Sequence, residues 1–339
     1  MRILAPIGVL FMATSALAAS FDCAKARTPQ EKAICSSPEL SAADDNLAAA
    51  YRRILRSVPP DFQNELKADQ LVWIRRLSIE CPAHNPEQRR YLQSCLLGRE
   101  NARTNTLKQR FRKANGVSLA WHSIYREAPG EPGARDPGEG PGSLEASWPE
   151  ALSDTPEWRA WNEAVADKTY ATAGLAPPNA PISQLKNWEA SPGEDVGVTT
   201  SLDFADSHLV ATTITTFRDG HGAHPSTHWF QFNWLLEKKR TLQAGDIFSA
   251  HSAWSDLLYS LTDQYLHKAL DVYDQAELAG KVHDITANPQ NWRIDEKGIS
   301  IIFQQYAVGC YACTPEPFII TWQQLRPLLN PGFIVPVKQ

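Results

Sequence analysis

Three histidines and two cysteines are, by type and spacing, the residues best suited to chemistry. His221, His224 and His228 share one stretch, and Cys310 and Cys313 have the C-x-x-C spacing of redox motifs. Histidines four residues apart can share a metal on a helix, but this stretch alternates like a strand, where four residues span about 13 Å. The cysteines lie between expected strands and do not begin a helix that would lower a thiol pKa. We therefore predict loop or core histidines and a structural disulfide, with no metal site.

Other catalytic signatures are absent from the sequence. It contains no G-x-S-x-G, no H-E-x-x-H and no P-loop, and its carboxylates form no evident catalytic pair. Arginine pairs at 52–53, 75–76 and 89–90 are spread over three expected helices, which is typical of a solvated surface. We predict a protein that is not an enzyme, has no cofactor and binds no nucleic acid. A hydrolase of unfamiliar type is the remaining catalytic alternative.

The first residues predict export. Arg2 precedes an apolar run from Ile3 to Ala13 and small residues ending in Ala16-Leu17-Ala18, the order found in a cleaved signal peptide. A membrane span needs about 20 apolar residues, and this run is shorter. We assign residues 1–19 as a signal peptide and expect a periplasmic or secreted protein with no membrane span.

Because we expect the protein to be exported, we expect its six cysteines to form disulfides. An even number outside the cytoplasm is typical of disulfides, and six cysteines allow 15 connectivities. Their grouping along the chain favours three local pairs, which are Cys23 with Cys35, Cys81 with Cys95, and Cys310 with Cys313.

Charge is divided unevenly along the chain. Residues 20–113 hold 17 Lys and Arg against 11 Asp and Glu, a net charge of +6, whereas residues 114–339 hold 15 against 27, a net charge of −12. Long-range attraction draws an acidic surface to a cationic partner. We therefore expect the second part of the chain to meet such a partner.

Helix start signals recur along residues 20–113. Each has a capping residue before the first turn, and most have a proline at the first helical position; they are Thr28-Pro29-Gln30-Glu31, Ser37-Pro38-Glu39, Asp61 and Asn85-Pro86-Glu87. The third helix has an expected inner face of Phe62, Leu66, Trp73, Ile74 and Leu77. These patterns predict a small all-α domain over residues 20–113, linked by two disulfides.

This helical part resembles the LprI family of lysozyme inhibitors. The resemblance covers residues 21–110 and rests on FDCAKARTPQEKAIC, SSPELSAADDNLAAAYRRIL, DQLVWIRR and the spaced Cys81 and Cys95. It implies an exported helical domain that in some members inhibits lysozyme. Asp45, Tyr51, Gln70 and Trp73 belong to the shared pattern, and we favour interhelical packing as their role.

The residue pattern from residue 114 onward predicts an α+β domain with a mainly antiparallel sheet. Residues 114–147 contain a strand pattern at Val117–Tyr125 and a Pro/Gly-rich acidic stretch at 128–143, either a linker or an insertion within this domain. We expect a helical segment over 144–168 that includes Trp148, then strands from Val196 onward and a helix from Trp254 to Leu270. Near the end of the chain, Asp295–Gly298 predicts a hairpin turn and Thr321–Gln324 a capping box.

We assign residues 148–339 as an α+β domain that resembles the extracellular domain of RsiV-type anti-sigma factors, closely over residues 200–330 and more weakly over 117–200. The resemblance is carried by RDGHGAHP at 218–225, the Gly245-Asp246-Ile247-Phe248 turn and YAVGCYACTPEPFIITWQQLRPLL from Tyr306 onward. It implies an α+β fold that senses lysozyme by binding it. The chain departs from the family in lacking a transmembrane helix and a sigma-binding segment, so sigma-factor control is not implied.

Both resemblances point to a lysozyme-type muramidase as partner. We predict an inhibitor whose loops 218–226 and 306–317 occlude the muramidase cleft, and we select the contact residues among aromatic, histidine and acidic side chains of these loops. They are Asp219, His221, His224, Tyr306, Tyr311 and Glu316. The alternative is a non-catalytic module that binds peptidoglycan in the cell wall.

Overall fold

The computed structural model describes residues 19–128, 142–174, 193–270 and 275–337. The chain divides between Arg110 and Phe111 into two compact units, which are described separately below. The first unit is helical and the second is α+β with a mostly antiparallel sheet, as the sequence predicts. Nearly all of the predicted signal peptide and most of the Pro/Gly-rich stretch lie outside the described residues. None of the helices within the described ranges reaches the length and hydropathy that crossing a bilayer demands.

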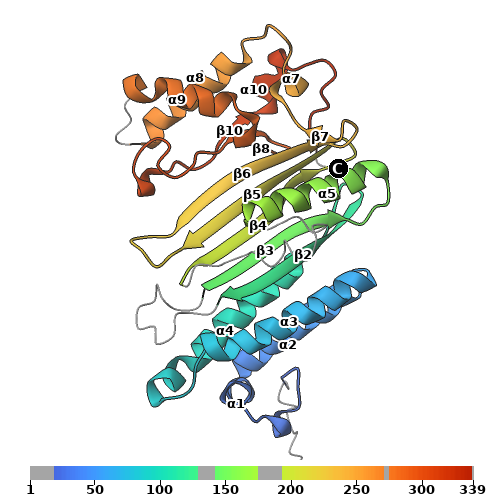
Figure 1. Cartoon of the computed structure of the whole chain (residues 1–339), viewed down its shortest axis with the longest axis vertical. Helices are drawn as coiled ribbons and strands as arrows, with labels where there is room; N and C mark the ends of the chain where they lie inside the picture. The colour runs from blue at the N-terminus through green and yellow to red at the C-terminus, as the bar shows by residue number, and fades with distance from the viewer. Residues whose placement is uncertain (1–18, 129–141, 175–192, 271–274, 338–339) are drawn as a thin grey trace, which may run out of the picture. The chain divides into compact units, whose positions relative to one another are not determined.

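Four α-helices make up the first unit (Figure 1). After a 3-10 turn at Cys23–Lys25 they are α1 (Pro29–Ser36), α2 (Pro38–Leu55), α3 (Pro60–Glu80) and α4 (Pro86–Gln109). Capping boxes at Thr28 with Glu31 and at Asn85 with Gln88 begin α1 and α4, because each pair satisfies backbone N–H groups that a helix start leaves free. The prediction that Asp61 caps α3 is wrong: the capping position is Pro59, two residues earlier, and Asp61 lies in the first turn of the helix.

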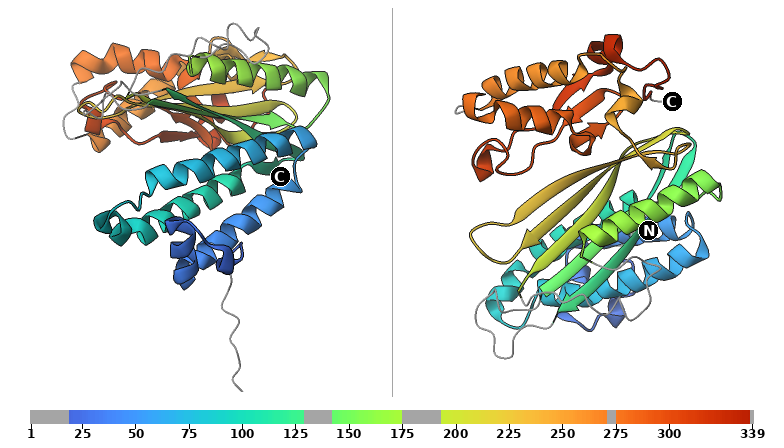
Figure 2. Two further views of the ribbon diagram at one scale, coloured as in Figure 1. Left: turned by 60° about the horizontal axis from the view of Figure 1, so that its bottom comes forward. Right: turned by 45° about the horizontal axis from the view of Figure 1, so that its top comes forward.

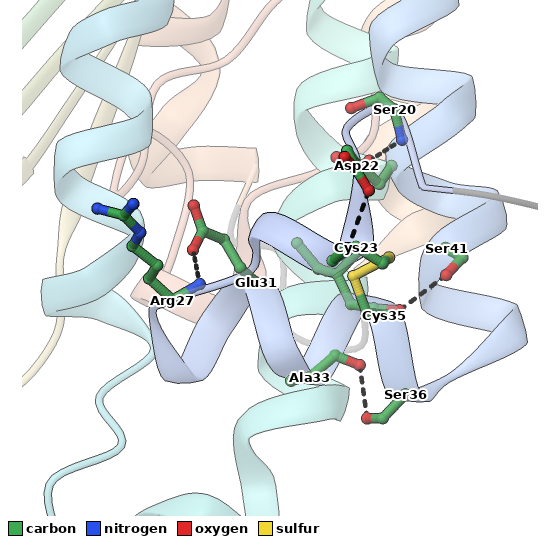
Figure 3. The surroundings of a disulfide bond; sticks show 12 residues. Ser20, Asp22, Cys23, Arg27, Glu31, Ala33, Cys35, Ser36 and Ser41 are labelled. Atoms are coloured by element: carbon green, nitrogen blue, oxygen red, sulfur yellow. Dashed lines mark hydrogen bonds between the residues drawn. A yellow bond between two sulfur atoms is a disulfide. The ribbon is translucent and has the colours of Figure 1, made fainter.

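Two disulfides connect the ends of these helices, with the predicted partners. Cys23 pairs with Cys35 at the end of α1, and Cys81 after α3 pairs with Cys95 in α4. Figure 3 shows the first of them beside the N–H of Arg27, which donates to Glu31, and the Ser36 hydroxyl, which donates to the carbonyl of Ala33. Each bridge closes a loop of roughly 15 residues, for which the chain-entropy model gives about 3 kcal/mol of stabilisation.

A small core packs α1, the start of α2, α3 and α4 together. Its buried members include Ile34, Leu40, Leu77 and Leu96, and Cys81 lies among them. The predicted inner face of α3 is wrong at Ile74, which is 52% exposed, since the packed stripe of α3 is narrower than the run of apolar residues suggests.

The second unit is built on a seven-stranded sheet in the order β1 to β7. The strands are β1 (Phe111–Ala114), β2 (Val117–Ala128), β3 (Gly142–Ala151), β4 (Asp195–Ala205), β5 (Leu209–Asp219), β6 (Ser226–Leu235) and β7 (Arg240–Thr241). All neighbours are antiparallel except β3 and β4, which are parallel. Because β2 and β3 pair directly, the Pro/Gly-rich stretch joins two strands of one sheet. Trp148 lies in β3, so the helix predicted over 144–168 is wrong there; helix α5 covers Pro156–Thr172.

A second sheet of three strands follows α7 (Ala244–Ile247), α8 (Trp254–Ala269) and α9 (Gln275–Ala287). Its strands are β8 (Trp292–Ile294), β9 (Gly298–Ile301) and β10 (Phe318–Thr321), in the order β10-β9-β8. The predicted hairpin turn and the helix at Trp254 are confirmed, and so is the capping box at Thr321, which begins α10 (Trp322–Leu325).

Two hydrophobic cores hold these layers together. Helix α5 lies across one face of the seven-stranded sheet (Figure 1), where Trp161 and Val165 pack against Val198 and Ile214. Figure 2 shows α8, α9 and the three-stranded sheet grouped together in orange and red, and β8 of this group contacts β4, β5 and β6 of the large sheet. There Leu258, Ile299 and Ile320 form one cluster with residues of β4 and β5. This second core fixes the segment that follows β9.

Candidate partner-binding surface

The turn between β5 and β6 presents the first group of predicted contact residues. The carboxylate of Asp219, the last residue of β5, accepts the N–H of His221 at 2.8 Å. His221 has a left-handed backbone with φ of +55°, which such a local side-chain bond helps to stabilise. Asp219 therefore shapes its own loop, and His221 and His224 stand exposed at its tip.

The segment after β9 lies beside this turn because two glutamines join it to β6. The side-chain oxygen of Gln304 accepts the N–H of Trp229 at 3.0 Å, and its amide nitrogen donates to the Trp229 carbonyl at 2.6 Å. Gln305 accepts the N–H of Thr227 at 2.9 Å. These side-chain amides bond the backbone groups that a neighbouring strand would otherwise bond along this part of β6. They bring Tyr306 to the turn.

His224, Tyr306 and Tyr311 form one cluster, named the His224 cluster below. His224 Nε2 lies 2.8 Å from the Tyr306 hydroxyl, and the imidazole stacks on the Tyr311 ring with centroids 4.0 Å apart. His224 Nδ1 is 3.0 Å from the carbonyl of Pro225, which can only accept a hydrogen bond. In the neutral ring Nδ1 therefore carries the proton, and the Tyr306 hydroxyl donates to Nε2.

The third disulfide holds Tyr311 in this cluster. Cys310 and Cys313 are bonded, as predicted, and the N–H of Cys313 donates to the Cys310 carbonyl at 2.9 Å. They enclose a single 3-10 turn, Tyr311–Cys313. Tyr306 is 54% exposed and has φ of +62°, so its ring is displayed at the surface from a backbone set by its neighbours.

The remaining predicted residues do not join this cluster. His228 is exposed on β6, and the main-chain carbonyl of Glu316 accepts the Tyr265 hydroxyl at 3.0 Å. Within the described ranges, no group of three or more His, Cys, Asp or Glu side chains is arranged to hold a metal ion. The structure therefore gathers His224, Tyr306 and Tyr311, and leaves Asp219, His221 and Glu316 around them.

In the helical unit, Arg103 of α4 organises the residues of the shared pattern. Its Nε donates to Gln70 Oε1 at 3.0 Å, it pairs with Asp69, and its guanidinium lies 5.9 Å from the centre of the Trp73 ring. Burial raises the pKa of Tyr51, on which the charges of Arg103 and Asp69 also act. Gln70 and Trp73 thus serve interhelical packing. Sequence reasoning missed Arg103, because no periodicity distinguishes a buried arginine from a solvated one.

Glu100, one turn before Arg103, is buried without full hydrogen bonding. It is 1% exposed, and its Oε2 has no hydrogen-bond partner among the described residues. Burial, with a smaller effect from the charge of Asp44, raises the pKa of Glu100 to about 8. An unfolded glutamate titrates near 4.3, so between these two pH values the folded state holds a proton that the unfolded state has lost.

The helical unit is therefore expected to lose stability as pH rises from about 5 to 8. The slope is at most about 1.4 kcal/mol per pH unit from this one group, and it ends above the folded pKa. Urea unfolding of wild type and Glu100→Gln at pH 6, 7 and 8 measures it. The free energy of unfolding of the variant minus that of wild type should be larger at pH 8 than at pH 6. Glu87→Gln, exposed in the first turn of the same helix, should leave the slope between pH 6 and 8 unchanged. Parallel curves for wild type and Glu100→Gln would contradict the expectation.

The chain thus consists, in its described residues, of a helical unit with two disulfides and an α+β unit with an exposed aromatic cluster. Residues 23–107 match the family model described as "Lysozyme inhibitor LprI", and residues 245–323 match the model described as "Protein of unknown function (DUF3298)". Neither model names the RsiV-type anti-sigma factors. No curated protein sequence matches the chain.

Two solved structures of the DUF3298 family are similar to it. One, from Bacteroides fragilis NCTC 9343, is 16% identical, with a TM-score of 0.46 over 65% of this chain and 96% of that one. The other, from Pseudomonas aeruginosa PAO1, is 14% identical, with a TM-score of 0.43 over 63% and 95%. At these values the two matches say nothing about what this chain binds.

Proposed function

We propose that this chain is an exported protein, periplasmic or secreted, that binds and inhibits a lysozyme-type muramidase. The observation that carries the proposal is the match of residues 23–107 to a lysozyme inhibitor family. Three disulfides fit an oxidising compartment outside the cytoplasm. The proposal makes the chain a binding protein with no catalytic role of its own.

The proposed contact surface is formed by loops 218–226 and 306–317 of the α+β unit. The His224 cluster supports it, because the stacking and the hydrogen bond hold exposed aromatic rings in place before binding, which lowers the entropy lost on association. The net charge of −12 over residues 114–339 would speed the encounter with a cationic enzyme. In the bound state these loops would occlude the cleft.

Titration of residues 20–339 into c-type lysozyme, following both heat and muramidase rate, tests the function. Saturable binding with loss of rate, weaker as salt concentration rises, is the expected result. Binding without loss of muramidase rate would mean that the protein senses lysozyme and does not inhibit it. Absence of binding to any lysozyme type, together with retention on purified peptidoglycan, would instead establish the cell-wall module.

A double substitution, Tyr306→Ala with Tyr311→Ala, tests the surface. Loss of an aromatic anchor at the centre of an interface costs about 2 kcal/mol or more, so lysozyme affinity should fall by roughly 30-fold or more. Tyr306→Phe, which keeps the ring and loses only the bond to His224, should have a smaller effect.

The matched control is Leu71→Ala with Ile74→Ala. These two side chains are 58% and 52% exposed on α3 of the helical unit, the part that matches the inhibitor family. Affinity should survive this change. If the α3 pair abolishes binding and the tyrosine pair does not, the contact lies on the helical unit and the proposed surface is wrong.

A further inference from the structure

The edge of β6 that faces away from β5 is only partly paired. β6 pairs with β5 along its whole length without a register shift, whereas β7 pairs with the last two residues of β6 alone. In an antiparallel pair, alternate residues direct both their N–H and their C=O to one side of the strand, and the residues between them to the other side. Trp229 binds the Gln304 amide on the side away from β5. Gln231 and Asn233, two and four residues further along, therefore direct their backbone groups to that same side.

Gln231 lies in a gap between two groups that occupy this edge. On one side of the gap, the Gln304 amide accepts the N–H of Trp229 and donates to its carbonyl. On the other side, Leu242 donates its N–H to the Asn233 carbonyl at 2.8 Å. The chain then turns into α7, so β7 does not continue alongside Gln231. Nothing in the described part of the chain bonds the N–H or the C=O of Gln231.

A cavity of about 430 Å³ borders this gap. It is lined by Phe230 and Phe232 and also by Gln231 and Asn233, although successive side chains of a strand lie on opposite faces of the sheet. The strand edge is the part of β6 that both pairs share. The side chain of Gln231 lies 2.8 Å from the Thr213 hydroxyl of β5, so it is the backbone of Gln231 that borders the cavity. The rest of the lining is Lys168, residues 241–244 and residues 288–290.

The unpaired groups of this gap match one residue of an extended polypeptide. In an antiparallel pair, one residue exchanges both of its backbone hydrogen bonds with the residue opposite. The Gln304 amide already makes two such bonds to Trp229, so this edge accepts an amide that belongs to no strand of the large sheet. Unpaired strand edges are templates for another chain, and β-strand addition is a common way of binding peptides.

The aromatic side chains of the cavity add apolar surface beside these backbone groups. Phe230 is 36% exposed, so an apolar side chain can cover it. In a segment paired with Gln231, the residues before and after the bonded one direct their side chains to the face that carries Phe230 and Phe232. The cavity volume is within the range of small-ligand sites and is enough for a short segment only.

We propose that this gap binds an extended polypeptide segment by β-strand addition. One residue of the segment exchanges its N–H and C=O with Gln231, and apolar residues on either side of it pack against Phe230 and Phe232. The inference does not depend on lysozyme binding, because the cavity lining contains no residue of loops 218–226 and 306–317.

Ligand-observed NMR on residues 20–339 without lysozyme tests the proposal, with the acetylated tripeptide amide Ac-Val-Ala-Val-NH₂ as probe. The peptide should bind saturably, and hydrogen exchange of the Gln231 amide should slow as it binds. The same peptide with its alanine N-methylated cannot donate to the Gln231 carbonyl. Its affinity should be about tenfold lower or less, because one backbone hydrogen bond is lost.

Two variants locate the site. Gln231→Pro removes the unpaired N–H, a change that the edge of a sheet tolerates, and should weaken peptide binding by about tenfold or more. Phe230→Ala removes apolar surface and should weaken it by roughly threefold or more. Phe217→Ala is the matched control, since Phe217 is 40% exposed on β5 and is not part of the cavity lining. It should leave binding unchanged.

Circular dichroism establishes that each variant is folded, and Phe230→Ala keeps the test valid if Gln231→Pro does not fold. No saturable peptide binding, equal affinity for the N-methylated peptide, or affinity unaffected by both cavity substitutions would overturn the proposal. Sedimentation velocity measures whether the edge pairs with a second copy of the chain. Self-association that Gln231→Pro abolishes, without peptide binding, would assign the edge to that second copy and also overturn the proposal.

Discussion

Replacing Arg103 by leucine is expected to lower the free energy of unfolding of the helical unit by about 3 kcal/mol. Removing one partner of a buried ion pair costs about 3–5 kcal/mol, because the other charge is left buried and uncompensated. The side chain of Arg103 is 5% exposed, and that of its partner Asp69 is 15% exposed. Arg110 also lies 3.2 Å from Asp69, so one partner remains and the lower end of the range applies. Gln70 loses its donor as well.

Urea unfolding followed by far-UV circular dichroism measures this loss. Arg99→Leu is the matched control, since Arg99 is on the same helix and pairs with Glu80 at 3.2 Å, but its side chain is 51% exposed. An exposed ion pair contributes at most about 1 kcal/mol. Equal losses for the two variants would show that the Arg103 network does not stabilise the helical unit.

Replacing Gly298 by alanine is expected to destabilise the α+β unit by about 3 kcal/mol or more, at the upper end of overpacking effects. A Cβ atom built at Gly298 would lie 2.1 Å from the carbonyl oxygen of Ile320 and 2.8 Å from the Cα of Thr321. Both are backbone atoms of β10, whose Thr321 pairs with Gly298. No side chain can move aside, so β9 and β10 must separate.

Chemical unfolding followed by tryptophan fluorescence tests this expectation, because Trp292 and Trp322 are buried beside the hairpin. Gly245→Ala is the control: a Cβ there has no atom within 4 Å, and the residue lies in helix α7. The control should be as stable as wild type. A Gly298→Ala variant with unchanged stability would mean that the close approach of β9 and β10 is not required.

The consequence of Gly298→Ala extends to the proposed contact surface. The segment that carries Tyr306 and Tyr311 begins after β9 and ends at β10, so the spacing of these strands sets the positions of both of its ends. Gln304 can bind the Trp229 backbone only while that spacing holds. We therefore expect the His224 cluster to separate in this variant.

The sequence predicted local features well because local forces produce them. The capping boxes at Thr28 and Thr321 and the start of α8 at Trp254 are all confirmed. The disulfides join cysteines that are at most 14 residues apart, where few competing pairings are reasonable. The wrong predictions concern residues whose structure depends on tertiary packing. Trp148 lies in a strand because β3 pairs with β2 on one side and with β4 on the other, and Ile74 is exposed because it lies outside the packed stripe of α3.

For the proposed contact surface, sequence reasoning selected residue types and loops, and the structure decided which of them meet. His224 and Tyr306 are 82 residues apart, and the amide of Gln304 that brings them together shows no signal in the sequence. The parallel pairing of β3 with β4 and the network around Arg103 likewise depend on distant segments. Caps, turns and short disulfides depend on a few neighbouring residues, so the sequence by itself determined them. Strand pairing, buried charge and the composition of a surface depend on which distant segments pack together, and only the tertiary structure decided those.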